Sequence, residues 1–296
     1  MSTSGRLTEV YGKAKRICYS TGEKFVIMSD CHRGVGTLGD IFLKNRHIFL
    51  TALRYYYRRG FSYVELGDGE ELWENKEPEE VLATHREVYR VLEDFHRDGR
   101  LYMLFGNHDI QKKKDGYFKE HCSGFVCEES GKETVFFRGL SVEEGLILEE
   151  RGTGRELFLV HGHQGDLFND RLWRVNRFLV RHIWRRLELL GMENPMSASG
   201  SGKKKTKVER KLAEWADNNH QLMIAGHTHR VKFLSDGSSY YFNDGSCVRP
   251  SSITALELEN GRLRLVEWSV MTRDDHSMYV GRKITDEIPL EQFDKQ

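Results

Sequence analysis

Residues 101–109 read LYMLFGNHD, a run of five apolar residues that ends abruptly in a polar cluster containing glycine. A short apolar run bounded by such a cluster is typical of a buried β-strand that leads into a loop. Four more stretches repeat this arrangement, and their apolar runs are Phe25–Met28, Tyr63–Leu66, Leu157–Val160 and Leu222–Ala225. The sequence therefore predicts five strands, each followed by a polar loop.

The polar clusters after these runs consist largely of residue types that bind metal ions. They are Asp30-Cys-His32, Gly67-Asp68, Gly106-Asn107-His108-Asp109, His161-Gly-His163 and Gly226-His227-Thr-His229. In open α/β sheets, ligands bind in the crevice at the carboxyl ends of the strands, so we expect the clusters to converge in space. Any single cluster is also explained as a polar turn with a hydrogen-bonded histidine. All five in this order favour a metal site.

Stretches with helical spacing of apolar residues separate the first three strands, over residues 41–59 and 78–97, and Pro78 suits the start of the second helix. This alternation indicates a layered α/β sheet. After residue 130 the pattern changes to hairpins, with RGTG (151–154) as one turn and Asn260-Gly261 as another. We therefore expect two packed sheets flanked by helices. Residues 271–296 are interpreted as a polar tail.

The composition is that of an ordinary globular protein, with 296 residues, of which 39% are hydrophobic and 30% charged. Lysine plus arginine and aspartate plus glutamate number 45 each, so no global field attracts nucleic acid, which is not expected as a partner. The five scattered cysteines suggest reduced thiols. No signal peptide or membrane-spanning run is recognised, and a cytoplasmic location is expected.

The segment 166–220 interrupts the strand pattern and is interpreted as a helical insertion. Between residues 171 and 211 there are 12 lysines and arginines against three acids, a net charge of +9. Within it, residues 171–190 (RLWRVNRFLVRHIWRRLELL) have helical spacing and three interpretations. The three interpretations are a cap helix over the site, a helix that lies on an anionic membrane surface, and a structural or dimer helix.

The five clusters resemble the signature of the calcineurin-like metallophosphoesterase family, which runs Asp-x-His, Gly-Asp-x-x-Asp/Glu, Gly-Asn-His-Asp/Glu, His and Gly-His-x-His. The resemblance extends from residue 25 to about residue 268. It implies a four-layer α/β/β/α sandwich with a helical insertion, in a phosphoesterase domain over residues 1–270. The family uses two divalent metal ions and a hydroxide that bridges them as the nucleophile.

The resemblance also assigns the metal ligands. One ion would be held by Asp30, His32, Asp68 and His229, and the other by Asp68, Asn107, His161 and His227, so that Asp68 bridges the two. Carboxylate, amide and imidazole ligands without thiolate suit borderline ions, with Mn²⁺ expected first and Fe or Zn²⁺ as alternatives. Two metals about 3.5–4 Å apart lower the pKa of bound water and clamp phosphoryl oxygens.

His108 matches the family position that faces the leaving-group oxygen as general acid or transition-state stabiliser. Glu71 matches the position that orients this histidine, and a carboxylate there would raise its pKa. An alternative for Glu71 is a solvated acid in a glutamate-rich run. Arg33, His163 and Arg230 are candidate substrate contacts, although both arginines are equally explained as surface ion pairs.

The substrate is less defined by the sequence. The motif Gly67-Asp68-Gly-Glu-Glu71-Leu-Trp73 lacks the Asp-Arg of the Ser/Thr protein phosphatases and looks more like the branch that contains the UDP-diacylglucosamine pyrophosphate hydrolases. That branch has Gly-Asn-Arg-Asp where this chain has His108, so its substrate does not carry over. We expect hydrolysis of a phosphomonoester, phosphodiester or pyrophosphate bond in a phosphorylated small molecule or lipid-linked substrate. A metal-dependent nuclease and a nonenzymatic scaffold are the alternatives.

Overall fold

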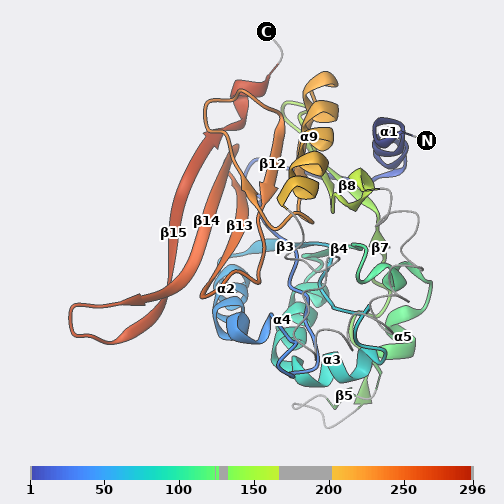
Figure 1. Cartoon of the computed structure of the whole chain (residues 1–296), viewed down its shortest axis with the longest axis vertical. Helices are drawn as coiled ribbons and strands as arrows, with labels where there is room; N and C mark the ends of the chain where they lie inside the picture. Colours follow the sequence, from blue (N-terminus) through green and yellow to red (C-terminus); the bar gives the residue numbers. More distant parts are fainter. Residues whose placement is uncertain (1, 124, 127–132, 167–201, 295–296) are drawn as a thin grey trace.

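The computed structural model describes residues 2–123, 125–126, 133–166 and 202–294. Figure 1 shows two β-sheets packed together, with helices on their outer faces. The expected two packed sheets flanked by helices are confirmed. The helix predicted over 171–190 lies outside the described residues.

The larger sheet has seven strands in the order β15-β14-β13-β2-β3-β4-β7. Its members are β15 (Met278–Pro289), β14 (Arg262–Thr272), β13 (Ser252–Glu259), β2 (Lys24–Met28), β3 (Phe61–Leu66), β4 (Leu101–Leu104) and β7 (Val142–Glu143). The strands β2, β3 and β4 run parallel, whereas β13 is antiparallel to β2. The loops after β2, β3 and β4 therefore leave the sheet at one edge.

The second sheet has six strands in the order β1-β8-β9-β10-β12-β11. Its members are β1 (Lys15–Tyr19), β8 (Gly145–Glu150), β9 (Glu156–Val160), β10 (Leu222–Ala225), β12 (Tyr241–Asp244) and β11 (Val231–Lys232). The strands β9 and β10 are parallel, and β8 and β9 form the hairpin predicted around RGTG. A separate two-stranded ribbon pairs β5 (Phe125–Val126) with β6 (Glu133–Thr134).

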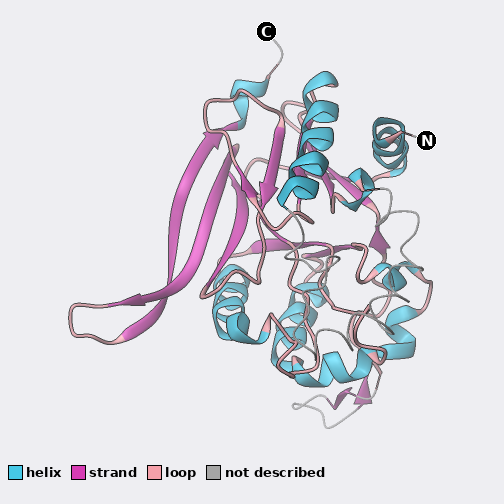
Figure 2. Cartoon of the chain, viewed as in Figure 1, coloured by secondary structure: helices cyan, strands magenta, loops and turns pink. Residues whose placement is uncertain are grey.

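The helices cover the outer face of each sheet (Figures 1 and 2). Beside the larger sheet lie α2 (Arg46–Arg58), α3 (Pro78–Thr84), α4 (Arg86–Arg97) and α5 (Tyr117–His121). Beside the second sheet lie α1 (Thr3–Lys13) and α9 (Gly202–Asn218). The helix predicted over 78–97 is interrupted at His85, whose buried ring lies 2.9 Å from the Asp40 carboxylate. No helix in the described residues is long and apolar enough to cross a membrane.

Strand β2 contributes alternate side chains to two hydrophobic cores. Because successive side chains of a strand point to opposite faces, Phe25 and Ile27 pack between the two sheets, while Val26 and Met28 pack under the helices of the larger sheet. A third core joins α1 and α9 to the second sheet through residues such as Val10 and Leu212. Four layers therefore stack in the order helix, sheet, sheet, helix.

One part of the domain description differs from expectation. The interpretation of 271–296 as a polar tail is wrong, because β15 pairs with β14 along its length and Ile288 is fully buried. An edge strand with much of its surface exposed lacks the continuous apolar run that marks a buried strand. Within the segment 166–220, the described helix α9 packs Leu212 and Trp215 into the third core. The hairpin predicted at Asn260-Gly261 is present, and both residues have the positive φ that its turn requires.

Candidate metal centre

The predicted ligands lie in loops that leave the carboxyl ends of five strands. Asp30 and His32 follow β2, and Asp68 follows β3. Asn107 follows β4, His161 follows β9, and His227 and His229 follow β10. Backbone hydrogen bonds tie these loops together across the sheets, including Asp30 N–H to the Gly67 carbonyl (3.1 Å) and Gly226 N–H to the His161 carbonyl (3.0 Å).

The backbone at the centre is strained. Five of the seven predicted ligands adopt positive φ, a conformation that non-glycine residues rarely occupy, and they are Asp30, His32, Asp68, His227 and His229. Such residues cost about 1–3 kcal/mol each and cluster at functional sites. Two glycines permit the close approach of the loops. A Cβ at Gly106 would lie 2.1 Å from Asp68 Oδ1, and one at Gly226 would lie 2.7 Å from Asp30 Oδ2.

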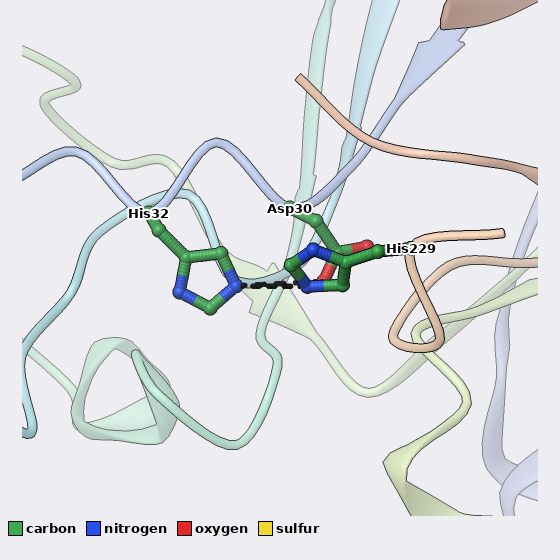
Figure 3. Close-up of side chains that lie close together, drawn as sticks. All are labelled: Asp30, His32 and His229. Atoms are coloured by element: carbon green, nitrogen blue, oxygen red, sulfur yellow. Dashed lines mark hydrogen bonds and ion pairs between the residues drawn. The ribbon is translucent and has the colours of Figure 1, made fainter. Parts of the chain in front are cut away.

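The first ligand group consists of Asp30, His32 and His229 (Figure 3). His229 Nε2 lies 3.0 Å from Asp30 Oδ1 and 3.2 Å from His32 Nε2. The second group consists of Asp68, His161 and His227, and His161 Nε2 lies 3.2 Å from Asp68 Oδ2. The same Asp68 oxygen lies 3.7 Å from His32 Nε2, so this carboxylate stands between the two groups.

The donor atoms fit a pair of divalent cations. Three buried atoms of the predicted ligands, Asp30 Oδ1, Asn107 Oδ1 and His161 Nε2, have no hydrogen-bond partner in the described part of the chain. Buried polar atoms are normally paired, and a cation would satisfy all three. The set is made of carboxylate, amide and imidazole groups, which suits divalent ions of borderline softness.

The charges of the ligands also suit cations. Burial alone would raise the pKa of Asp30, but the neighbouring histidines, His229 above all, outweigh burial and hold it well below its ordinary value. Burial alone would lower the pKa of His161, but the Asp68 carboxylate outweighs it and raises the pKa to about 9. A cation at the centre therefore has to displace a proton from His161.

Hydrogen bonds behind the ligands fix their orientation. His161 Nδ1 donates to the Leu66 carbonyl (2.9 Å), which directs Nε2 toward Asp68. The Ser29 hydroxyl lies 2.5 Å from Asp30 Oδ2 and 2.8 Å from Asp244 Oδ1. Because one hydroxyl carries one proton, Ser29 can donate to only one of the two carboxyl groups at a time. Burial raises the pKa of Asp244 well above its ordinary value, which favours its protonated form beside Asp30.

Glu71 holds two histidines at once. Its Oε1 lies 2.7 Å from His108 Nδ1, and its Oε2 lies 2.8 Å from His32 Nδ1. Burial alone would favour the neutral forms of Glu71 and His108. Their attraction to each other outweighs burial, so the pKa of Glu71 is lowered to about 2 and the pKa of His108 is raised. Trp73 stacks on the His108 ring at 4.1 Å between centroids and donates from Nε1 to the Asn107 carbonyl (2.7 Å). The sequence interpretation did not include a contact of Glu71 with His32 or a role for Trp73.

The candidate substrate contacts differ in position. The prediction that Arg33 contacts the substrate is wrong. Its guanidinium is fully buried, 2.8 Å from Glu65 and 3.0 Å from Glu70. His163 is 1% exposed beside His161, and burial holds its pKa well below the ordinary value, so its ring is neutral. Arg230 is exposed and contributes to a shallow depression of about 540 Å³ that also contains the predicted ligand His229.

Two features of the site were absent from the sequence interpretation. Arg249, exposed and without an ion pair in the described residues, lines the same depression as Arg230. Asp109 accepts hydrogen bonds from the backbone of Gly106 (2.7 Å) and Gly69 (3.0 Å) and pairs with Lys112 at 3.0 Å. The last residue of Gly-Asn-His-Asp therefore joins the loops after β3 and β4, and its place inside the motif was the only signal for it.

Comparison with known proteins identifies a family for this chain. The sequence profile of the calcineurin-like phosphoesterase family matches residues 23–231. Among solved structures, the chain is similar to Vps29 of Chaetomium thermophilum, with 11% identity and a TM-score of 0.41 over 91% of this chain and 98% of that one. A search of curated proteins finds none that matches the sequence. Since the family profile covers more than half of the chain, the protein belongs to the calcineurin-like phosphoesterase family.

Proposed function

We propose that the protein is a dinuclear metal-dependent hydrolase of phosphoester bonds. The observation that carries this proposal is the position of the Asp68 carboxylate between two ligand groups, one with Asp30, His32 and His229 and the other with His161 and His227. Asn107 adds to the second group a buried amide oxygen that has no hydrogen-bond partner among the described residues. Mn²⁺ is the first expected ion, with Fe or Zn²⁺ as alternatives.

The bound ions would supply a nucleophile, by lowering the pKa of water, and would neutralise charge on the phosphoryl oxygens. The chain itself supplies a proton donor. Glu71 fixes His108 Nδ1 at 2.7 Å and favours the charged imidazole, so the other ring nitrogen, Nε2, can donate to the leaving-group oxygen. Stacking against Trp73 restricts rotation of the His108 ring. Glu71 is a positioning residue in this scheme, because it acts through His108 and His32.

The substrate proposed is a phosphomonoester, phosphodiester or pyrophosphate carried by a small molecule or a lipid. Arg230 and Arg249 place two guanidinium groups in the depression beside His229, where each can form paired hydrogen bonds with an anionic oxygen of the substrate. Glu209, the acid among the described residues that line the depression, accepts a hydrogen bond from Thr228 Oγ1 at 2.9 Å. The depression therefore favours a substrate with negative charge next to the scissile bond.

The test is hydrolysis of a chromogenic phosphomonoester and a chromogenic phosphodiester by Mn²⁺-loaded protein. Asp68→Asn is the inactive variant, because an amide cannot replace the carboxylate that stands between the ligand groups. Glu77→Gln, an exposed acid outside the centre, is the matched control. We expect turnover of at least one ester by the wild type and the control, and none by Asp68→Asn. Metal-loaded protein that turns over neither ester would favour the scaffold alternative, and turnover unaffected by Asp68→Asn would refute the proposed centre.

A further inference from the structure

A cavity of about 860 Å³ lies beside α5 and β7, on a part of the molecule separate from the predicted metal ligands. Its walls come from two segments, between residues 112 and 119 and between residues 135 and 143. Ligand pockets in proteins have volumes of about 300–1,000 Å³. The cavity contains none of the residues assigned to metal binding, and the proposed phosphoesterase chemistry gives it no role.

The rim of this cavity carries an excess of positive charge. Its exposed cations are Lys113, Lys114, Lys119 and Arg138. None of the four forms an ion pair with another described residue. The acids in the same lining are Asp115 and Glu143, and Glu143 already lies 3.4 Å from Lys15 Nζ. Cations that lack an ion pair around a concavity focus their field into it and attract an anion.

The lining of the cavity also includes apolar and aromatic side chains. Tyr117 and Phe118 are 5% and 7% exposed, whereas Phe137, also in the lining, is fully buried. Leu140 and Val142 extend the same wall and pack against the core beneath the helices. A purely inorganic anion would use the rim but not these walls. The combination therefore fits a molecule that has both a negatively charged group and an apolar portion.

One residue of the lining connects the cavity with the loops of the metal centre. Lys112 is 3% exposed, and its Nζ contacts Glu70 and lies 3.0 Å from Asp109 Oδ2 and 3.3 Å from Glu65 Oε1. These partners neutralise Lys112, so it adds no charge for a ligand. The short helix η2 (Ile110–Lys113) begins directly after Asp109 and ends at the rim cation Lys113. The cavity therefore adjoins a buried, ion-paired lysine.

We propose that this cavity is a second binding site, outside the metal centre, for a phosphorylated small molecule with an apolar or aromatic portion. The phosphate would lie among Lys113, Lys114, Lys119 and Arg138, and the apolar portion would contact Tyr117 and Phe118. Several cations around one phosphate allow more than one charge-assisted hydrogen bond, which is the strongest kind available at an exposed rim.

The test is isothermal titration calorimetry of the full chain with ATP, AMP and adenosine in the presence of EDTA. EDTA removes divalent ions, so metal-dependent binding at the centre does not contribute. The variant Lys114→Ala/Arg138→Ala removes two rim cations, and Arg58→Ala/Lys283→Ala removes two exposed cations elsewhere as a matched control. We expect saturable binding of ATP or AMP that weakens at least tenfold in the rim variant and is unchanged in the control. Adenosine should bind at least tenfold more weakly than AMP, and added salt should weaken nucleotide binding.

Asp68→Asn separates this inference from the proposed function, because it disrupts the metal centre and leaves the cavity intact. Nucleotide binding that persists in Asp68→Asn supports the second site even if the protein hydrolyses no ester. Three outcomes would overturn the inference. They are the absence of saturable nucleotide binding to folded wild-type protein, equal affinity in the rim variant and the wild type, and binding that disappears in Asp68→Asn.

Discussion

Replacing Glu71 by glutamine changes the group that holds both His108 and His32. The side chain keeps its size, but its amide offers one acceptor oxygen and one NH₂ group in place of two carboxylate oxygens. The distances of 2.7 and 2.8 Å to the two Nδ1 atoms mean that one histidine would face an NH₂ group instead of an acceptor. A hydrogen bond to a charged group contributes about 1.5–3 kcal/mol. Loss of one such bond corresponds to a fall of roughly 10- to 150-fold in kcat.

The assay compares two phosphodiesters under saturating Mn²⁺, one with a nitrophenol leaving group and one with a simple alcohol. A nitrophenolate departs without a proton, whereas an alkoxide needs one, so Glu71→Gln should reduce kcat for the alkyl ester much more. Glu71 raises the pKa of His108, so its loss lowers that pKa. The pH above which kcat declines should therefore move to lower pH for the alkyl ester. Glu77→Gln should leave both substrates and the pH profile unchanged.

Three results would each count against this account of Glu71. An unchanged kcat would show that neither histidine depends on the carboxylate. Equal losses for the two esters would indicate damage to the metal group through His32 and no role in proton donation. A pH profile that stays in place, with kcat reduced, would mean that Glu71 does not control the protonation of His108.

The remaining predictions concern the buried groups around the centre. Arg33→Met removes the buried guanidinium that pairs with Glu65 and Glu70. It should lower the free energy of unfolding, measured by urea denaturation, by about 3–5 kcal/mol. A loss below about 1 kcal/mol would contradict the buried ion pair. Apparent Mn²⁺ affinity should rise with pH up to about pH 9, because His161 is protonated below its pKa and must lose that proton to bind. Calorimetry in buffers of different ionisation enthalpy should detect the released proton, and a pH-independent affinity would refute the assignment. Asp244→Asn replaces a carboxyl whose raised pKa favours the neutral form, so it should change the free energy of unfolding by less than about 1 kcal/mol in the same assay. A larger loss would indicate an ionised Asp244.

The site residues that could be predicted from the sequence are those that directly follow a predicted strand. Asp30, Asp68 and His161 each follow a short apolar run, so strand prediction was enough to place each of them at the carboxyl end of a strand, although β9 belongs to the second sheet. Five of the predicted ligands have a positive φ that the sequence did not predict. Asp and His indicate this conformation less clearly than glycine does. The helical layers were predictable from apolar spacing, whereas the edge strand β15 was not.

Contacts between distant segments account for most of what the sequence did not predict. Arg33 follows a predicted ligand and was interpreted as a substrate contact, but pairing with Glu65 and Glu70 requires the neighbouring strand and loop. Arg249 reaches the depression beside His229 only because β12 brings the chain back to the second sheet. Side-chain orientation depends on such long-range packing, and local patterns contain no information about it.

The most direct test of the dinuclear centre is to follow phosphoester turnover while Mn²⁺ is added stepwise to metal-free protein, with bound metal measured by mass spectrometry. The account predicts that activity reaches its maximum when two ions are bound per chain, and that Asp68→Asn neither binds the second ion nor gains activity. Full activity with one ion or none, or two bound ions in Asp68→Asn with wild-type turnover, would contradict it.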